Sequence, residues 1–133
     1  MALERESDLL AAARAVRERA HAPYSRFKVG AALLDEQGRI HAGCNVENAA
    51  YPQGLCAEAG AVAAMVAAGG TRIAAAVVVG EGPRLTTPCG GCRQKLREFA
   101  GDDLPVIVAD GQTVRARFTL GELLPASFGP EHL

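Results

Sequence analysis

The sequence predicts an α/β fold, a three-layer α/β/α sandwich with a mixed central sheet of about five strands. Three observations support this prediction. Short apolar runs occur in two pairs, each joined by turn residues, and such pairs are typical of antiparallel hairpins. Residues 73–79 form a continuous apolar run, the pattern of a central strand that is buried on both faces. Helical segments alternate with these strands, which indicates helices that cover a sheet.

The N-terminal part of the chain is expected to form a helix followed by a hairpin. Apolar residues recur with a helical period from about residue 3 to residue 20, and Pro23 ends this stretch. Residues 29–34 are predicted to form a buried strand. Gly38 then marks the turn into a second strand at residues 39–44, so these two strands should pair.

Two further helices are expected to pack on the sheet. The first, at residues 55–68, is rich in alanine and ends at two glycines, which suit the position after a helix. The second, at residues 88–100, has Thr87 as its expected N-cap and Pro88 at its first helical position.

The last two strands are expected at residues 106–109 and 114–118, on either side of the Asp110-Gly111 turn. The sequence contains no internal repeat, linker or low-complexity tract. We therefore expect residues 1–133 to form a single domain.

Composition and charge limit the functions that this chain can have. Its 133 residues carry a formal net charge of −1, with acidic and basic residues dispersed, which disfavours binding to a nucleic-acid backbone. A small uncharged substrate fits better. No apolar run approaches the ~20 residues of a membrane span, and the charged N-terminus does not resemble a secretory signal. We expect a cytoplasmic protein that binds neither nucleic acid nor membrane.

Three cysteines and one glutamate form the main candidate site. Cys56 is followed two residues later by Glu58, and a Pro-Cys-Gly-Gly-Cys segment contains Cys89 and Cys92. Three thiolates suit a Zn²⁺ ion and leave its fourth tetrahedral position open for water. A carboxylate beside that position can move protons to and from the water, so the pattern favours a catalytic zinc site.

Local structure is expected to assist these ligands. Cys89 should lie in the first turn of its helix with Cys92 on the same face, and Cys56 should begin the other helix. The positive end of each helix dipole stabilises a thiolate. An alternative is that Cys89 and Cys92 are a redox pair, but Glu58 has no role in that chemistry.

A resemblance that covers nearly the whole chain is carried by five segments, residues 22–33, 43–49, 51–58, 87–94 and 122–130. The chain resembles the cytidine deaminase family, of the small homotetrameric kind. The resemblance implies hydrolysis of cytidine and 2′-deoxycytidine to the uridines with release of ammonia in pyrimidine salvage, one zinc ion per subunit, and active sites shared between subunits. It also implies that Glu58 takes a proton from the water that attacks C4 of the pyrimidine, and then protonates ring N3 and the leaving ammonia.

The substrate contacts follow partly from pattern and partly from the resemblance. Asn45 and Glu47 alternate in an extended segment, so both side chains should lie on one side, where they can bind vicinal hydroxyls. The resemblance assigns this pair to the ribose; a polar strand edge is the alternative. It further implies that the pyrimidine stacks on Phe27 and contacts Ala57. Tyr51 and Phe128 are expected to reach a neighbouring subunit's site.

One position departs from the family pattern. Many members have arginine directly after the catalytic glutamate, where this chain has Ala59. We expect Arg93 and the helix N-termini to offset part of the thiolate charge. Deaminases of blasticidin type or of other nucleoside analogues, a deaminase of nucleic acids, and a non-catalytic module stabilised by zinc are the alternative functions.

Overall fold

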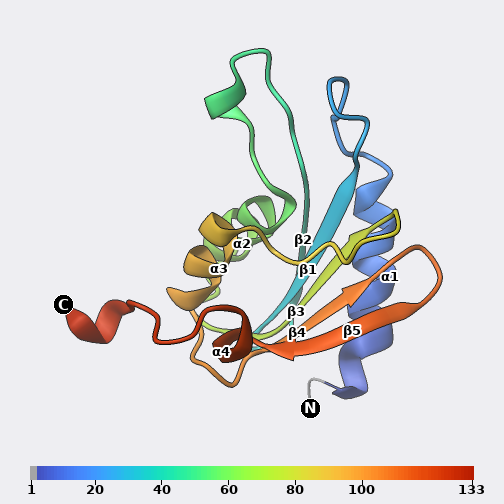
Figure 1. The fold of residues 1–133 in the computed structure, drawn as a ribbon. Coiled ribbons are helices and arrows are strands. Elements are labelled where there is room, and N and C mark those ends of the chain that lie inside the picture. Colours follow the sequence, from blue (N-terminus) through green and yellow to red (C-terminus); the bar gives the residue numbers. More distant parts are fainter. Residues whose placement is uncertain (1–2) are drawn as a thin grey trace.

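A mixed five-stranded sheet forms the centre of the computed structural model, which describes residues 3–133 (Figure 1). The strand order is β2-β1-β3-β4-β5; β3 and β4 are parallel, and the other neighbouring pairs are antiparallel. The hairpins β1–β2 and β4–β5 confirm the two predicted pairs. The strands are β1 (Val29–Asp35), β2 (Ile40–Cys44), β3 (Ile73–Gly80), β4 (Pro105–Ala109) and β5 (Val114–Thr119).

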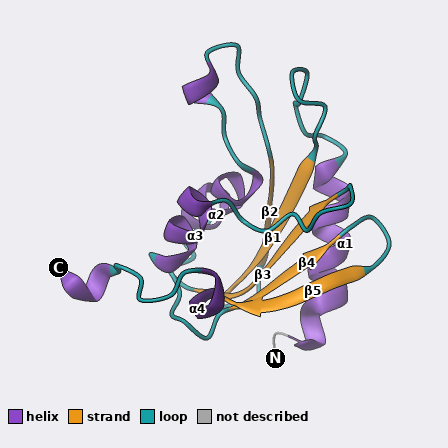
Figure 2. Ribbon diagram, viewed as in Figure 1, coloured by secondary structure: helices purple, strands orange, loops and turns teal. Residues whose placement is uncertain are grey.

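Helices cover the sheet on both faces (Figure 2). Four are α-helices, and single turns of 3-10 helix lie at Leu3–Arg5, Tyr51–Gln53 and Pro130–His132. Among residues 3–133, the longest α-helix has 12 residues, and no helix is long and apolar enough to span a bilayer. The α-helices are α1 (Glu6–Arg17), α2 (Ala57–Ala67), α3 (Gly90–Arg97) and α4 (Leu120–Leu123).

The core consists of two apolar layers, one on each face of the sheet. On one face, Leu9 of α1 belongs to a buried cluster with Ala32 and Val77 of the strands. On the other face, Met65 of α2 and Leu96 of α3 belong to a cluster with Leu33. Successive residues of β1 thus serve opposite layers, as the alternation of a strand requires. This arrangement confirms the predicted three-layer sandwich.

The predicted ends of the first helix were wrong. It was expected over residues 3–20, whereas α1 covers Glu6–Arg17 and is preceded by a 3-10 turn. After Arg17 the backbone makes tighter bonds, from Arg19 N to Val16 O and from Ala20 N to Arg17 O. The apolar period continues through this turn, although the α-helical hydrogen bonding does not.

The start of the second long core helix was also predicted incorrectly. It was expected to begin at Pro88 with Thr87 as its N-cap, but α3 begins at Gly90 and its N-cap is Cys89. The Thr87 hydroxyl instead accepts a hydrogen bond of 3.2 Å from Arg93. Cys89 therefore lies at the helix boundary and not within the first turn.

Close packing between β2 and α2 requires a glycine. A Cβ atom added to Gly43 would lie 2.7 Å from the carbonyl carbon of Gly60 and would also overlap backbone atoms of Ala57 and Ala61. The start of α2 can approach the sheet only because residue 43 has no side chain. This contact places Cys56 and Glu58 at the end of β2.

A buried carboxylate closes the β1–β2 hairpin. The side chain of Asp35 accepts hydrogen bonds from the backbone N–H groups of Gln37 (2.8 Å) and Arg39 (2.9 Å), and it pairs with Nε of Arg39 (2.9 Å) and Nε2 of His41 (2.8 Å). Burial acts to raise the pKa of Asp35, but the bonds from His41, Arg39 and Gln37 hold it well below its ordinary value. The hairpin depends on this ionised acceptor.

Candidate metal centre and active site

Three cysteine thiols meet where α2 and α3 begin. Cys56 is the N-cap of α2, Cys89 is the N-cap of α3, and Cys92 is the third residue of α3. Their Sγ atoms all lie within 4.8 Å of one another, and those of Cys56 and Cys89 are 3.7 Å apart. Tetrahedral zinc with Zn–S bonds of about 2.3 Å places two sulfurs about 3.8 Å apart. The donor set and its spacing therefore fit a zinc ion with one position left open; Cys44 of β2 lies outside the cluster.

The three thiols affect one another's ionisation. Burial, Glu58 and the other two thiols raise the pKa of Cys92, and burial and Cys89 raise that of Cys56. Burial also acts to raise the pKa of Cys89, but the backbone N–H of Cys92 and the neighbouring thiols lower it below its ordinary value. Three thiolates together need a compensating cation, which a divalent metal ion supplies.

Glu58 points into the same site from the second position of α2 and is only 5% exposed. Burial raises the pKa of Glu58, while the Cys92 thiol and the positive charge of Lys95 act in the opposite direction. A carboxyl group whose pKa is raised above its ordinary value is a stronger base and is suited to accepting and returning a proton. Lys95 was not identified from the sequence, because its proximity depends on how α3 packs against α2.

A cavity of about 200 Å³ connects these groups to solvent. It brings together six of the predicted site residues: Phe27, Asn45, Cys56, Ala57, Glu58 and Cys89. Val29, Thr86 and Thr87 also line it and were not predicted as site residues. The two threonines directly precede the Pro-Cys-Gly-Gly-Cys segment, and this adjacency was the available signal.

Asn45 fixes the backbone next to Phe27. Its Oδ1 accepts a 2.8 Å hydrogen bond from Val29 N, and its Nδ2 donates a 2.8 Å bond to Phe27 O. The Asn45 amide therefore holds the backbone of both Phe27 and Val29, which line this side of the cavity. The second N–H of Nδ2 is still available to a ligand.

Glu47 and Tyr51 line a separate cavity of about 250 Å³ with Tyr24, so Asn45 and Glu47 do not share one pocket here. The Glu47 carboxylate accepts bonds from Tyr24 N (2.9 Å) and Ser25 N (3.1 Å), and it also bonds to the Ser25 hydroxyl. The hydrogen bond from Ser25 Oγ lowers the pKa of Glu47. The rings of Tyr24 and Tyr51 make an edge contact, with centroids 6.2 Å apart.

Phe128 lies on the C-terminal segment, outside the residues that line the cysteine cavity of its own chain. Its ring is 56% exposed and stacks on His132, with centroids 4.7 Å apart. Its carbonyl accepts a 2.8 Å bond from Gln94 of α3. In Figure 1 this C-terminal segment extends away from the sheet.

Arg93 was expected to offset part of the thiolate charge, but its guanidinium bonds to other groups. Its guanidinium donates to Pro88 O (2.7 Å), Leu123 O (2.7 Å) and the Thr87 hydroxyl (3.2 Å). It joins the start of α3 to the end of α4. Ala59, where many family members have arginine, is buried at 9% exposure. Within residues 3–133, the cation that acts on this site is Lys95, through Glu58.

Comparisons with known proteins agree with this geometry. Residues 3–108 match the family model described as the cytidine and deoxycytidylate deaminase zinc-binding region. A cytidine deaminase of Sporosarcina psychrophila is 41% identical over 94% of this chain and 92% of its own. The crystal structure of cytidine deaminase from Burkholderia pseudomallei has a TM-score of 0.85 at 46% identity and covers 92% of this chain and 98% of that one. The corresponding enzyme of Mycobacterium tuberculosis has a TM-score of 0.81 at 40% identity, covering 93% and 97%.

Proposed function

Because the chain belongs to the cytidine and deoxycytidylate deaminase family, we propose that it hydrolyses cytidine and 2′-deoxycytidine to uridine and 2′-deoxyuridine and releases ammonia. One observation carries this proposal. Three thiols at the spacing of zinc ligands lie beside a buried glutamate in a cavity of nucleobase size. The single domain of residues 1–133 would act in pyrimidine salvage in the cytoplasm.

Cys56, Cys89 and Cys92 would hold one zinc ion per subunit. Bound there, Zn²⁺ supplies a Lewis acid that makes a water molecule nucleophilic at neutral pH. The helix N-termini next to Cys56 and Cys89 favour the thiolate form that such binding needs.

Glu58 would move the protons of the reaction. It would take one proton from the water that attacks C4 of the base and deliver it to ring N3, and it would then take the second proton from the hydroxyl group added at C4 and deliver it to the departing amino group, which leaves as ammonia. Its buried position supports both transfers, because burial raises the pKa of the carboxyl group above its ordinary value and so favours the return of a proton once it has been accepted.

The remaining cavity residues would hold the nucleoside. The face of Phe27 supports the pyrimidine, and the backbone N–H of Ala57, at the first position of α2, is free to donate to the base. Asn45 and Glu47 would bind the ribose hydroxyls with the hydrogen-bonding capacity that they retain beyond the backbone of residues 24–29.

The active form would be a homotetramer in which neighbouring subunits complete each site. The exposed rings of Tyr51 and Phe128 support this, because each projects from its own chain without filling its own cysteine cavity. Exposed aromatic rings are unfavourable in solvent, and contact with a neighbouring subunit's nucleoside pocket would explain why Tyr51 and Phe128 are exposed in the single chain.

One assay tests the proposed function. Cytidine is added to purified protein, and its absorbance is followed with and without a zinc chelator, together with metal analysis per subunit. We expect turnover, about one zinc per chain, and loss of activity on chelation that added zinc restores. Stable zinc binding without turnover of any cytosine nucleoside would indicate the non-catalytic module instead.

A further inference from the structure

The C-terminal segment is fastened to α3 on both sides of Phe128. Before the ring, Nε of Arg97 donates a 2.8 Å hydrogen bond to the hydroxyl of Ser127. Beyond the ring, the same guanidinium pairs with the carboxylate of Glu131 at 2.6 Å. Gln94, one turn earlier on α3, donates a 2.8 Å bond to Phe128 O. Two side chains of one helix therefore hold the backbone that carries the ring.

The contact between Arg97 and this segment is closely packed. The Arg97 side chain is only 12% exposed, and Gly129 is buried. A Cβ atom added to Gly129 would overlap the Arg97 guanidinium and the Glu131 carboxylate. The guanidinium can lie against the backbone here only because residue 129 has no side chain. This contact is therefore part of the packing, unlike an exposed ion pair, which contributes little.

Phe128 remains exposed between these anchored neighbours. Its ring is 56% exposed, and one of its faces stacks on His132 at an interplanar angle of 22°. A segment that is anchored for its own stability would bury its aromatic ring, because that burial supplies the largest hydrophobic gain. Here the backbone is held and the ring is left in solvent. This arrangement is typical of a side chain that is presented to another molecule.

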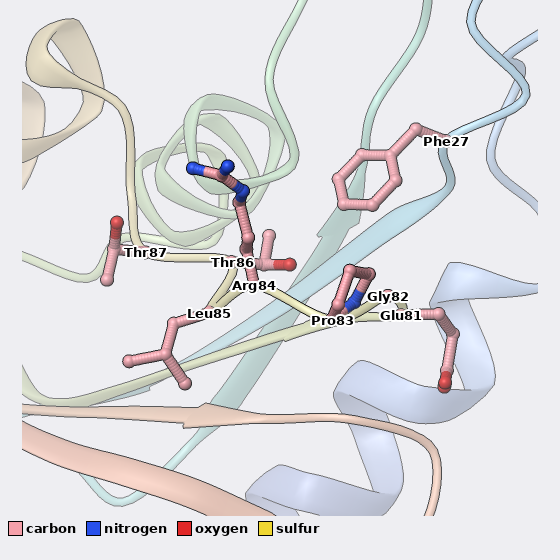
Figure 3. A pocket seen from close by; sticks show the side chains of 8 residues that line it. All are labelled: Phe27, Glu81, Gly82, Pro83, Arg84, Leu85, Thr86 and Thr87. Atoms are coloured by element: carbon pink, nitrogen blue, oxygen red, sulfur yellow. The ribbon is translucent and has the colours of Figure 1, made fainter.

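The active site of the single chain has room for a further ring. A cavity of about 520 Å³, lined by Phe27 and residues 81–87, adjoins the cysteine cavity (Figure 3). Phe27 and two threonines line both cavities. Arg115 of β5 holds the 81–87 loop through bonds to Gly82 O (2.7 Å) and Pro83 O (3.0 Å). Among the residues that the structure describes, Phe27 is the one aromatic that lines either cavity. The space beside it is open, as sharing of the site requires.

We propose that Arg97 is a positioning residue of the shared site, because it holds the C-terminal segment in the conformation that brings Phe128 to a neighbouring subunit's nucleoside. This inference rests on the proposed function. Without Arg97 the segment adopts other conformations, and the ring contacts the substrate only in the fraction of subunits that keep the required one. The apparent affinity for substrate falls by that fraction, while proton transfer by Glu58 is unchanged.

Steady-state kinetics of clamp variants test the proposal. Arg97→Ala should raise KM for cytidine about tenfold and leave kcat within about threefold. Glu131→Ala, at an exposed position, should raise KM in the same direction, and Arg97→Lys, which keeps the charge pair, should recover part of the loss. Arg5→Ala is the matched control and should leave KM unchanged. The Arg5 guanidinium also joins a carboxylate, of Asp8 (3.1 Å), to a backbone carbonyl, of Gly38 (2.8 Å). A native KM in both Arg97→Ala and Glu131→Ala overturns the proposal.

A double-mutant cycle shows whether Arg97 acts through Phe128. Phe128→Ala already removes the ring, so the addition of Arg97→Ala should change its KM by less than about twofold. Fully additive effects would mean that Arg97 acts by another route, and they overturn the proposal. Zinc content is measured for every variant, because α3 also carries Cys92. Loss of zinc from Arg97→Ala would assign Arg97 to the support of α3 and would likewise overturn it.

Mixed assemblies show in which subunit Arg97 acts. When Arg97→Ala subunits are mixed with an excess of Glu58→Gln subunits, each working site has the Glu58 of an Arg97→Ala chain. It can then receive Phe128 from a chain whose Arg97 is intact, so KM should return to the native value. A KM that stays raised places the effect within one subunit and overturns the proposal, while the proposed function stands. No turnover of cytidine by the native protein overturns both.

Discussion

Glu58 combines two properties that rarely occur together in one side chain. It lies at a helix N-terminus, where a carboxylate is stabilised, and it is 5% exposed, which disfavours its charge. Burial dominates and raises its pKa. The four residues within two positions of it, Cys56, Ala57, Ala59 and Gly60, include no second carboxylate that could share the proton.

Glu58→Gln should abolish most turnover and leave the metal in place. The amide preserves the shape of the side chain and cannot transfer protons, so kcat should fall by about 10²–10⁴. Turnover and zinc content are measured together, with Glu36→Gln as the control at an exposed carboxylate that bonds Thr71 and Arg72. Near-native kcat in Glu58→Gln would assign the base to another residue.

Asp35 should make stability depend on acid pH. Its pKa is lower in the folded chain than the ordinary value of about 3.9, so its contribution is full above that value and is lost as pH falls below it. Asp35→Asn should lower the free energy of unfolding at neutral pH by about 2–4 kcal/mol, because Arg39 and His41 lose their acceptor.

Urea unfolding of the native protein and of Asp35→Asn, from pH 7 down to pH 3, measures the contribution of Asp35 to the free energy of unfolding. The difference between them should shrink as the pH falls. Asp110→Asn is the matched control, since Asp110 also accepts backbone bonds in a turn but is partly exposed, and it should cost about 1 kcal/mol. A difference that is constant with pH would show that Asp35 is not the ionised acceptor.

The elements were predictable where their signals are local. The turn at Gly38 and the apolar run of β3 lie in the sequence itself, and each strand was predicted within about two residues of its observed ends. The start of α3 was not predictable, because Arg93 takes the Thr87 hydroxyl that would have capped the helix. The four-residue helix α4 was missed, although its Thr119–Glu122 capping box is a recognisable pattern.

The residues of the candidate site were likewise predictable only where their signals are local in the sequence. Cys56, Cys89 and Cys92 were predicted from the spacing of metal ligands in the sequence, and Glu58 from its position two residues after Cys56; the structure brings the four residues together. Lys95 and Arg115 act across elements, so their positions depend on helix packing and strand order. No local pattern in the sequence marks such contacts.

Gly43→Ala should displace α2 from the sheet. The added Cβ overlaps backbone atoms of α2, including Gly60 C at 2.7 Å, and backbone cannot yield as a flexible side chain would. We expect a loss of about 1–3 kcal/mol in stability and a lower kcat, since Cys56 and Glu58 move with the helix. Thermal unfolding and turnover are compared with Gly101→Ala, where the nearest atom is 3.6 Å away. If kcat were unchanged in Gly43→Ala, the close packing of α2 on the sheet would not be required for catalysis.

Arg115→Ala should weaken substrate binding with little effect on chemistry. Without Arg115 the 81–87 loop loses its bonds to the hairpin, so Thr86 and Thr87 are less well ordered. We expect KM to rise about tenfold and kcat to stay within about threefold. Arg117→Ala is the control on the same strand, because its guanidinium pairs with Glu6 of α1. If both substitutions changed KM equally, the effect would come from the stability of β5 and not from the bonds between Arg115 and the 81–87 loop.

At the scale of the whole molecule, the proposed sharing of sites between subunits has a direct test. Phe128→Ala should be weakly active, because each active site then lacks the ring that a neighbouring subunit would supply. Glu58→Gln should be nearly inactive, because it lacks the residue that transfers protons. Mixed tetramers of the two variants should regain activity, since a Glu58→Gln subunit can supply Phe128 to an intact Glu58. Light scattering follows assembly. A fully active monomer, or no recovery on mixing, would remove Tyr51 and Phe128 from the site.

The thiols come from two helices that are separated in the chain by β3, and this has a consequence for biosynthesis. Cys56 leaves the ribosome before β3, while Cys92 follows 36 positions later, since 92 − 56 = 36. At 5–20 residues per second this interval lasts roughly two to seven seconds. Until Cys89 is added, three residues before Cys92, Cys56 is the one member of the three-thiol cluster on the nascent chain. A metal site with all three thiols can therefore be completed only after Cys92 has been synthesised.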